Sequence, residues 1–409
     1  MLIGLVGKPS VGKSTFFKAA TLAEVDIASY PFTTIKANHG VGYVKVECVE
    51  KDFNTKCNPN HGFCIDGNRF VPIDLMDVAG LVPGASEGKG LGNQFLNDLR
   101  EADAFIHIVD ISGTTDIEGK LCESHDPAED IQFLEDELNN WYFNIFKKGW
   151  RTFSRRVDMQ GQKLSDAIST QFSGLKVNEE HVKKVLLKTK LSEKCSEWSD
   201  EDVLKFSSEL RKLSKPMIIA ANKIDVASGK ENYERIIKEF PDLIIIPCSA
   251  DSELALRQAV KAELIEYIPG EKDFVLTEGV EDTLKGTRTS DNKILNKKQL
   301  EALNKIKENV LNKFEVGTGV QEVLNKVVFN LLGYLPIFPA SANRLADSKG
   351  NILPDCFLLP PGSTALDFAF FLHTDFGNNF IKAIDAKTKR ALGKDYNLKA
   401  RDALEIITR

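Results

Sequence analysis

The chain has 409 residues, of which 42% are hydrophobic and 27% are charged, and its formal net charge at pH 7 is −6. This length predicts two or three domains, and the composition is typical of a soluble globular protein. The acidic net charge argues against a protein whose whole surface binds nucleic acid. The sequence has no run of roughly eighteen apolar residues, the length that a membrane-spanning helix needs, so no membrane partner is expected.

Buried strands are the first predicted elements. Short apolar runs are separated by segments long enough for helices, as in parallel strands covered on both faces. The runs are 2–6, 71–76, 104–109, 217–221 and 243–246. We predict an α/β fold with a doubly wound, mostly parallel sheet that binds ligands beyond the carboxyl ends of its strands. Because a strand begins at residue 2, no targeting peptide is expected and the protein should be cytoplasmic.

A glycine-rich loop follows the first run. Residues 7–14 read Gly-Lys-Pro-Ser-Val-Gly-Lys-Ser, which matches G-x-x-x-x-G-K-[ST] between a strand and a helix. Such a P-loop directs successive backbone N–H groups at phosphates. Lys13 is expected to reach the β- and γ-phosphates, and the Ser14 hydroxyl to bind Mg²⁺. The predicted nucleotide-binding residues of this loop are Gly7, Pro9, Ser10, Val11, Gly12, Lys13, Ser14 and Thr15.

A second motif, Asp77-Val78-Ala79-Gly80, ends the run 71–76. Asp77 is expected to hold Mg²⁺ through water, and the Gly80 N–H to contact the γ-phosphate. The tetrapeptide alone is a weak signal, but its place at the end of a strand after a P-loop makes it a specific one.

A third motif predicts which base is bound. Asn222-Lys223-Ile224-Asp225 follows the run 217–221. An Asp carboxylate accepts hydrogen bonds from N1–H and the exocyclic amine of guanine, whereas adenine N1 is an acceptor and would be repelled. Unpaired buried polar groups make such discrimination worth several kcal/mol. Ser249 and Ala250, after the last strand, complete the predicted site, with the Ala250 N–H directed at guanine O6. GTP and GDP are the predicted ligands.

Roughly a hundred residues lie between the third and fourth strands, more than a crossover needs. Asp126 and Pro127 form a helix start, and apolar residues then recur at near-heptad spacing. We predict an inserted antiparallel helical hairpin whose second helix covers about 178–195. Further helices are expected at 297–314 and 319–332, and a small α+β unit with a helix at 366–373 follows Gly350.

Charge is uneven within the predicted insertion. Residues 116–137 hold nine acidic residues and one lysine, whereas 147–190 hold eleven basic and four acidic residues. Two solvated helix faces would explain this pattern. The alternative is that the basic stretch docks RNA or an acidic partner.

The seven cysteines are scattered and odd in number, which favours reduced thiols over a disulfide framework. Cys48, Cys57, His61 and Cys64 offer four soft ligands and could hold zinc. Their spacing matches no finger pattern, and residues 58–62 read as a plain turn, so both interpretations stay open.

Several segments resemble the Obg and YchF GTPases, with the greatest similarity to the archaeal YchF-like branch over most of the chain. They are Pro31–Ile35, Asp77–Ala85, Gly90–Leu96 and, resembling the family's TGS domain, Leu359–Phe368, His373–Asp375 and Phe380–Asp385. The resemblance implies a G domain at 1–114, an inserted coiled-coil-like domain at 115–214, a second part of the G domain with extra helices at 215–335, and a TGS domain at 350–409.

The resemblance also implies a Mg²⁺-dependent GTPase that works as a two-state switch and associates with ribosomes or RNA, here as a monomer. Thr34 would join Mg²⁺ and the γ-phosphate, with Thr33 as the alternative if the register differs by one. Lys13, Thr34 and Gly80 would be catalytic, and Ser14, Thr34 and Asp77 would bind the metal. Many relatives carry Asn at the position of Ser10 to help bind potassium, so activation by K⁺ stays open.

Hydrolysis is expected to be slow. Leu81 stands where small GTPases place a water-orienting Gln, and the first arginine is Arg69, so switch I supplies no arginine finger. One alternative is a GTP sensor that barely hydrolyses. The other is an ATPase in the manner of YchF, against which the intact Asp225 argues.

Overall fold

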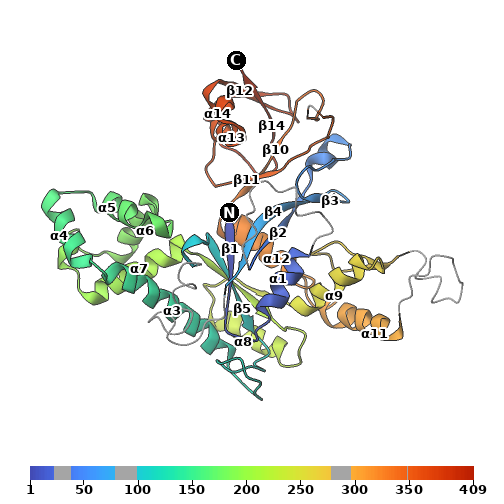
Figure 1. The fold of residues 1–409 in the computed structure, drawn as a ribbon, viewed down its shortest axis with the longest axis horizontal. Coiled ribbons are helices and arrows are strands. Elements are labelled where there is room, and N and C mark those ends of the chain that lie inside the picture. The colour runs from blue at the N-terminus through green and yellow to red at the C-terminus, as the bar shows by residue number, and fades with distance from the viewer. Residues whose placement is uncertain (23–37, 79–98, 278–295, 348) are drawn as a thin grey trace, which may run out of the picture.

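The computed structural model describes residues 1–22, 38–78, 99–277, 296–347 and 349–409. Figure 1 shows a central sheet with helices on both faces, a helical lobe to one side, and a C-terminal unit above the sheet. Thr33, Thr34, Gly80 and Leu81 lie outside the described residues.

The central sheet has strand order β2-β4-β1-β5-β6-β7, and β3 pairs with β4. Strands β1, β4, β5, β6 and β7 run parallel, whereas β2 is antiparallel to β4. Four of the five predicted apolar runs form strands of this sheet and the fifth, 243–246, overlaps β7 by two residues, which confirms the predicted fold class. The strands are β1 (Leu2–Val6), β2 (His39–Glu47), β3 (Phe63–Ile65), β4 (Asn68–Asp77), β5 (Ala104–Asp110), β6 (Met217–Asn222) and β7 (Ile245–Pro247).

Helices cover both faces because neighbouring strand residues point to opposite sides. Ile108 packs with Phe16 in one core, whereas Val109 packs with Ile131 and Ile236 in another. In the G domain, where α11 packs on α9 in a separate core, the helices are α1 (Lys13–Thr21), α8 (Gly229–Glu239), α9 (Ala250–Lys261), α11 (Lys297–Ile306) and α12 (Val320–Asn325). The last two continue as π-helical turns, Lys307–Leu311 and Lys326–Leu331. A two-stranded sheet, β8 (Ile265–Glu266) with β9 (Val275–Leu276), follows α9.

The insertion between β5 and β6 contains more than a hairpin. The described residues form α3 (Pro127–Lys147), α4 (Trp150–Gln160), α5 (Leu164–Gln171), α6 (Glu179–Thr189) and α7 (Asp200–Ser214). Asp126 caps α3, as predicted, by accepting from the Ala128 N–H at 2.9 Å. A helix does occur near 178–195, as α6, but its predicted pairing with α3 was wrong, because α3 packs along α7 instead. Phe206 and Leu210 of α7 enter the aromatic core of the lobe, and α6 packs on α5 and α7.

The C-terminal unit is a five-stranded sheet of order β11-β10-β14-β12-β13. The first of these strands in chain order, β10, lies before residue 350, which is where the sequence analysis placed the start of this unit. The helix predicted at 366–373 is α13, which begins after a capping box of Thr364 and Asp367. The elements are β10 (Leu335–Pro339), β11 (Phe357–Leu359), α13 (Ala365–Leu372), α14 (Thr374–Asn378), β12 (Phe380–Asp385), β13 (Ala391–Leu392) and β14 (Ala403–Thr408).

Within the described ranges, none of the helices combines the length and the apolar character needed to span a membrane.

Candidate functional site

The P-loop connects β1 to α1 and depends on two glycines. Gly7 has φ +148° and Gly12 has φ +95°, values that side chains rarely tolerate. A Cβ on Gly12 would lie 2.4 Å from Asn222 Nδ2, and one on Gly7 would lie 2.5 Å from the Ile108 carbonyl oxygen. The loop can therefore lie close to β5 and to the N-K-x-D segment only with glycine at these positions.

Lys13 holds its ammonium inside this loop. Its Nζ donates to the carbonyl oxygens of Gly7 at 3.0 Å and Lys8 at 2.9 Å. Burial lowers the pKa of Lys13, and the nearby Asp77 carboxylate opposes that shift. A poorly solvated cation at the N-terminus of α1 is suited to phosphate oxygens, which would replace the lost hydration.

Ser14 and Asp77 form the predicted metal pair. The Ser14 hydroxyl donates to Asp77 Oδ2 at 3.1 Å, because β4 lies beside β1 and ends at the level of the P-loop. Burial raises the pKa of Asp77, while Ser14 and Lys13 oppose that shift. A hydroxyl and a carboxylate are hard oxygen ligands that fit Mg²⁺, and the charge of the ion would favour the ionised state of the acid. The third predicted ligand, Thr34, and the γ-phosphate contact Gly80 lie outside the described residues.

Asn222 connects the phosphate loop to the base loops. Its Nδ2 donates to the Val11 carbonyl oxygen at 2.8 Å, and its Oδ1 accepts from the Ala250 N–H at 2.9 Å. Asn222 is buried, so both bonds are shielded from water. Because the Ala250 N–H already donates to Asn222, a contact with guanine O6 would have to share this donor. Ser249 is also engaged, through a 2.7 Å hydrogen bond from its hydroxyl to that of Ser252.

Lys223 and Asp225 differ in their partners. Lys223 has φ +63° and forms a 2.7 Å ion pair with the buried carboxylate of Asp110, at the end of β5. Burial of Asp110 disfavours its charge, but hydrogen bonds from Lys223, Ser112 and Thr115 prevail and lower its pKa. The sequence analysis did not identify Asp110 as a site residue, although its position as an acidic residue at the end of a buried strand could have indicated this role. Asp225 is exposed, and its carboxylate makes no hydrogen bond or ion pair with the described residues.

Lys8 is a second residue that the sequence pattern did not single out. Although it belongs to the P-loop it is buried, and its Nζ lies 2.7 Å from Asp130 Oδ2 in the first turn of α3. It also donates to the Thr115 carbonyl oxygen at 2.7 Å, and His125 lies 2.8 Å from the other oxygen of Asp130. The P-loop is therefore attached directly to the start of the helical lobe.

Three protein-family descriptions match the chain. Residues 2–145 match the 50S ribosome-binding GTPase family, residues 220–341 match the Obg-like GTPase YGR210-like, G4 motif-containing domain, and residues 349–408 match the TGS domain. The gap between the first two matched segments, 2–145 and 220–341, falls within the helical lobe, which lies between β5 and β6. Together with the parallel sheet and its P-loop, these matches define a GTP-binding protein of the P-loop class.

Individual relatives narrow this class. An uncharacterised GTP-binding protein of Methanocaldococcus jannaschii is 45% identical over 408 residues, 100% of this chain and 99% of the relative. The crystal structure of a GTP-binding protein from Pyrococcus horikoshii OT3 has 40% identity and a TM-score of 0.75, with 100% of both chains covered. The ribosome-binding ATPase YchF of Bacillus subtilis is 31% identical over 273 residues, 62% of this chain and 66% of the relative. The chain belongs to the Obg/YchF-like family of GTP-binding proteins, and it ends in a TGS domain.

Proposed function

We propose that the protein hydrolyses GTP to GDP and phosphate with Mg²⁺, and that its two nucleotide states form a switch linked to the ribosome. One observation carries the choice of guanine. In the N-K-x-D segment, Asn222 and Lys223 are engaged with other protein groups, whereas the exposed Asp225 carboxylate has no partner among the described residues. This carboxylate can accept from guanine N1–H and the exocyclic amine, and it would repel adenine N1.

Hydrolysis would rest on charge neutralisation. Lys13 and the backbone N–H groups of the P-loop stabilise negative charge that develops on the phosphates. Ser14 and Asp77 would hold Mg²⁺, with Thr34 completing the set; the ion supplies further neutralisation of the phosphate oxygens. Leu81 has no donor or acceptor to orient water, so we expect a slow intrinsic rate that a partner or a monovalent cation raises. Ser10 leaves the role of potassium open.

Nucleotide competition tests the choice of base. Asp225→Asn should weaken GTP binding by about 1–3 kcal/mol, because guanine donors lose their acceptor. The same change should strengthen binding of xanthosine triphosphate, whose C2 carbonyl can accept from the new amide. Asp242→Asn, at an exposed acid before β7, is the matched control and should leave both affinities unchanged. Equal affinity of the unchanged protein for ATP and GTP would instead support an ATPase, the activity named for the B. subtilis relative.

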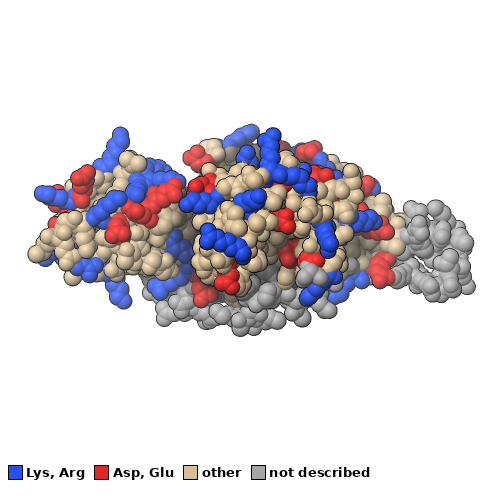
Figure 2. Space-filling view, turned by 90° about the horizontal axis from the view of Figure 1, so that it is seen from above, with Lys and Arg blue, Asp and Glu red and all other residues tan. Residues whose placement is uncertain are grey.

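The link to the ribosome is supported by the names of the matched family and of that relative, and α4 offers a surface for it. Most lysines of the basic stretch 147–190 are paired: Lys147, Lys163, Lys183, Lys184 and Lys188 form ion pairs within the lobe. Figure 2 accordingly shows acidic side chains interspersed with basic ones on the lobe. The exposed Arg151, Arg155 and Arg156 form no ion pair with the described residues and line a hollow of about 370 Å³ on α4. We assign RNA phosphates to this surface.

A further inference from the structure

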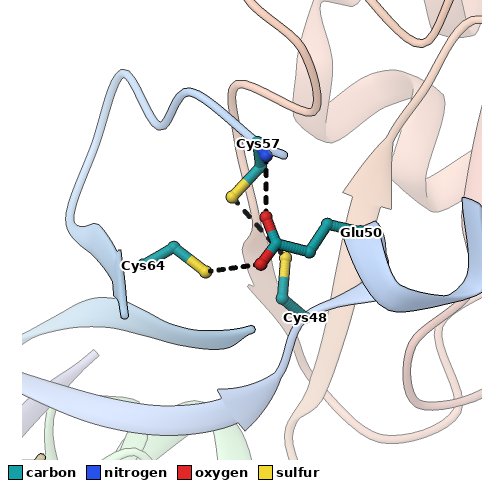
Figure 3. A group of neighbouring side chains, drawn as sticks. All are labelled: Cys48, Glu50, Cys57 and Cys64. Carbon is teal, nitrogen blue, oxygen red and sulfur yellow. Dashed lines mark hydrogen bonds between the residues drawn. The ribbon is translucent and has the colours of Figure 1, made fainter. Parts of the chain in front are cut away.

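Four side chains with metal-binding atoms converge beside the edge of the central sheet (Figure 3). Cys48 follows β2, Glu50 lies in the short 3₁₀ helix η2 (Val49–Phe53), Cys57 lies in the loop after it, and Cys64 lies in β3. One atom from each of the four lies within 4.8 Å of the others. His61, the fourth ligand considered from the sequence, is instead 2.8 Å from Asp355.

Two separations within this cluster match a tetrahedral zinc site. With Zn–S bonds of about 2.3 Å and Zn–O bonds of about 2.1 Å, tetrahedral geometry places two sulfurs about 3.8 Å apart and a sulfur and an oxygen about 3.6 Å apart. Cys48 Sγ and Cys57 Sγ are 3.8 Å apart, and Cys64 Sγ and Glu50 Oε1 are 3.6 Å apart. The second oxygen of Glu50 accepts from the Cys57 N–H at 2.7 Å, which fixes the orientation of the carboxylate.

A buried arginine beside the cluster supplies an independent indication. Arg69 is 0% exposed, and its Nη2 donates to the Leu353 carbonyl oxygen at 2.6 Å and lies 4.0 Å from Cys48 Sγ. Within the described part of the chain, its Nε and Nη1 have no hydrogen-bond partner. A guanidinium stays charged, and a buried unpaired charge is costly. With neutral thiols the cluster contributes one negative group, the Glu50 carboxylate, whereas three thiolates and that carboxylate around a divalent ion carry a net charge of −2.

We propose that Cys48, Glu50, Cys57 and Cys64 bind one zinc ion in a structural site. Four protein ligands leave no open position for a substrate, which distinguishes structural from catalytic zinc. Little regular structure otherwise holds the loop at 54–62, so the binding energy of the ion would stabilise its fold.

The proposed ion would also support the attachment of the TGS domain. The loop that carries Cys57 donates from Asn58 N to the Ile352 carbonyl oxygen and from Asn60 N to the Pro354 carbonyl oxygen, both at 2.8 Å. Arg69 binds Leu353 between these two acceptors. Fixing the loop therefore fixes the main-chain contacts between the G domain and the start of the C-terminal unit.

Metal analysis of the full chain tests the site directly. Protein purified with reductant and dialysed against a weak chelator should retain about one zinc per chain. Replacement by Co²⁺ should produce thiolate-to-metal charge-transfer absorption, which reports sulfur ligands without any mutation. Cys57→Ser and Cys64→Ser should each lose the zinc, whereas His61→Ala and Cys122→Ser should keep it. Circular dichroism and GTP binding establish that each variant is folded.

Three results would overturn the proposal. The first is an unchanged chain that binds neither zinc nor cobalt with sulfur ligands. The second is full retention of zinc by folded Cys57→Ser and Cys64→Ser. The third is a metal-free native protein with a Cys48–Cys57 disulfide, which would require the sulfurs to close from 3.8 Å to about 2.05 Å. As a further expected result, zinc removal should speed proteolysis between the G domain and the TGS domain but leave GTP affinity unchanged.

Discussion

The two hydrogen bonds of Asn222 show how a base-recognition motif can act by positioning. Its side-chain amide lies between Val11 of the P-loop and Ala250 of the last base loop, and it uses both of its functional ends on protein. The phosphate half and the base half of the site are thereby held at one separation. Recognition of the base is left to Asp225, the residue of the motif with a free carboxylate among the described residues.

Asn222→Ala should therefore reduce the affinity for GTP and GDP alike, by about 1–3 kcal/mol, because two buried backbone groups lose their partner. Asn232→Ala is a matched control: its amide also donates to a backbone carbonyl, that of Ile111 at 2.9 Å, but it does not join the P-loop to Ala250. Both variants should lower the unfolding temperature, and isothermal titration should detect weaker nucleotide binding in Asn222→Ala alone. Equal affinity in the two variants would contradict the positioning role.

Lys13→Ala and Ser14→Ala should abolish hydrolysis and leave the fold intact. The partners of both side chains are P-loop carbonyls or Asp77, so neither variant removes a contact of the apolar core. Single-turnover hydrolysis with and without Mg²⁺, and thermal unfolding without nucleotide, provide the two measurements. Retained magnesium-dependent turnover in either variant would remove that residue from the site.

At the scale of elements, the contact between the P-loop and α3 is the least expected feature. Lys8 and Asp130 are both buried and form an ion pair that joins two parts of the chain far apart in sequence. Removing one partner of such a pair leaves an uncompensated charge, whereas replacing both with apolar residues can be neutral. The pair is therefore open to a double-mutant test.

Lys8→Met should lower the free energy of unfolding by about 3–5 kcal/mol, and Lys8→Met with Asp130→Leu should recover much of that loss. Burial already raises the pKa of Asp130, and Lys8 and His125 oppose it. Without Lys8 the folded-state pKa should rise further above the unfolded value. The folded state then binds the extra proton, so the stability lost by Lys8→Met should be larger at pH 8 than at pH 5. Urea unfolding at both pH values measures this, and a pH-independent loss would contradict it.

At the scale of the whole molecule, the G domain carries two appended parts, the helical lobe and the TGS domain (Figure 1). The TGS domain contacts the end of the sheet opposite to the P-loop, where Arg401 pairs with Glu47 beside the start of β4. The lobe is attached through Lys8 and α3 and the TGS domain through the loop at 54–62, so the two attachments lie in different parts of the G domain. The lobe presents the arginines of α4 that we assign to RNA.

Replacing Arg151, Arg155 and Arg156 together with Gln should weaken co-sedimentation with ribosomes and reduce the slope of log affinity against log salt, by up to about three. The matched control replaces Lys183, Lys184 and Lys188 with Gln, which changes the net charge equally at residues that form ion pairs within the lobe. The control should retain most of the binding. Equal losses in both triple variants would indicate a general charge effect and not a docking surface.

Sequence patterns predicted those features of the fold and the site that depend on residues close together in the sequence. The apolar runs predicted the parallel sheet. Two motifs predicted Ser14 and Asp77 as ligands of one metal ion, and the structure places their side chains within hydrogen-bond distance because β4 lies beside β1. Which helix accompanies α3 is decided by packing, and the local pattern at 178–195 gave the wrong partner. The predicted domain limits, and the roles of Thr34 and Gly80, stay predictions.

The cysteine cluster shows the same limit. Three thiols and His61 were candidates because they are soft metal ligands, but η2 adds Glu50 and the C-terminal unit removes His61, by pairing it with Asp355. Glu50 lies within the segment but was not considered, whereas the partner of His61 lies in a distant part of the chain that the local sequence does not show. Lys8 was also indistinguishable from a solvated loop lysine until the start of α3 was placed beside it.

The ion pair of Lys8 attaches one end of the long helix α3 to the P-loop. The helix is held at Asp130 in its first turn and runs to Lys147, about 25 Å further along its axis at 1.5 Å per residue. A tilt of about 5° around the held end displaces the far end by roughly 2 Å, so the motion grows along the arm. A small shift of the P-loop around a phosphate would thus be magnified where α3 meets α4, on the side of the lobe that carries the arginines.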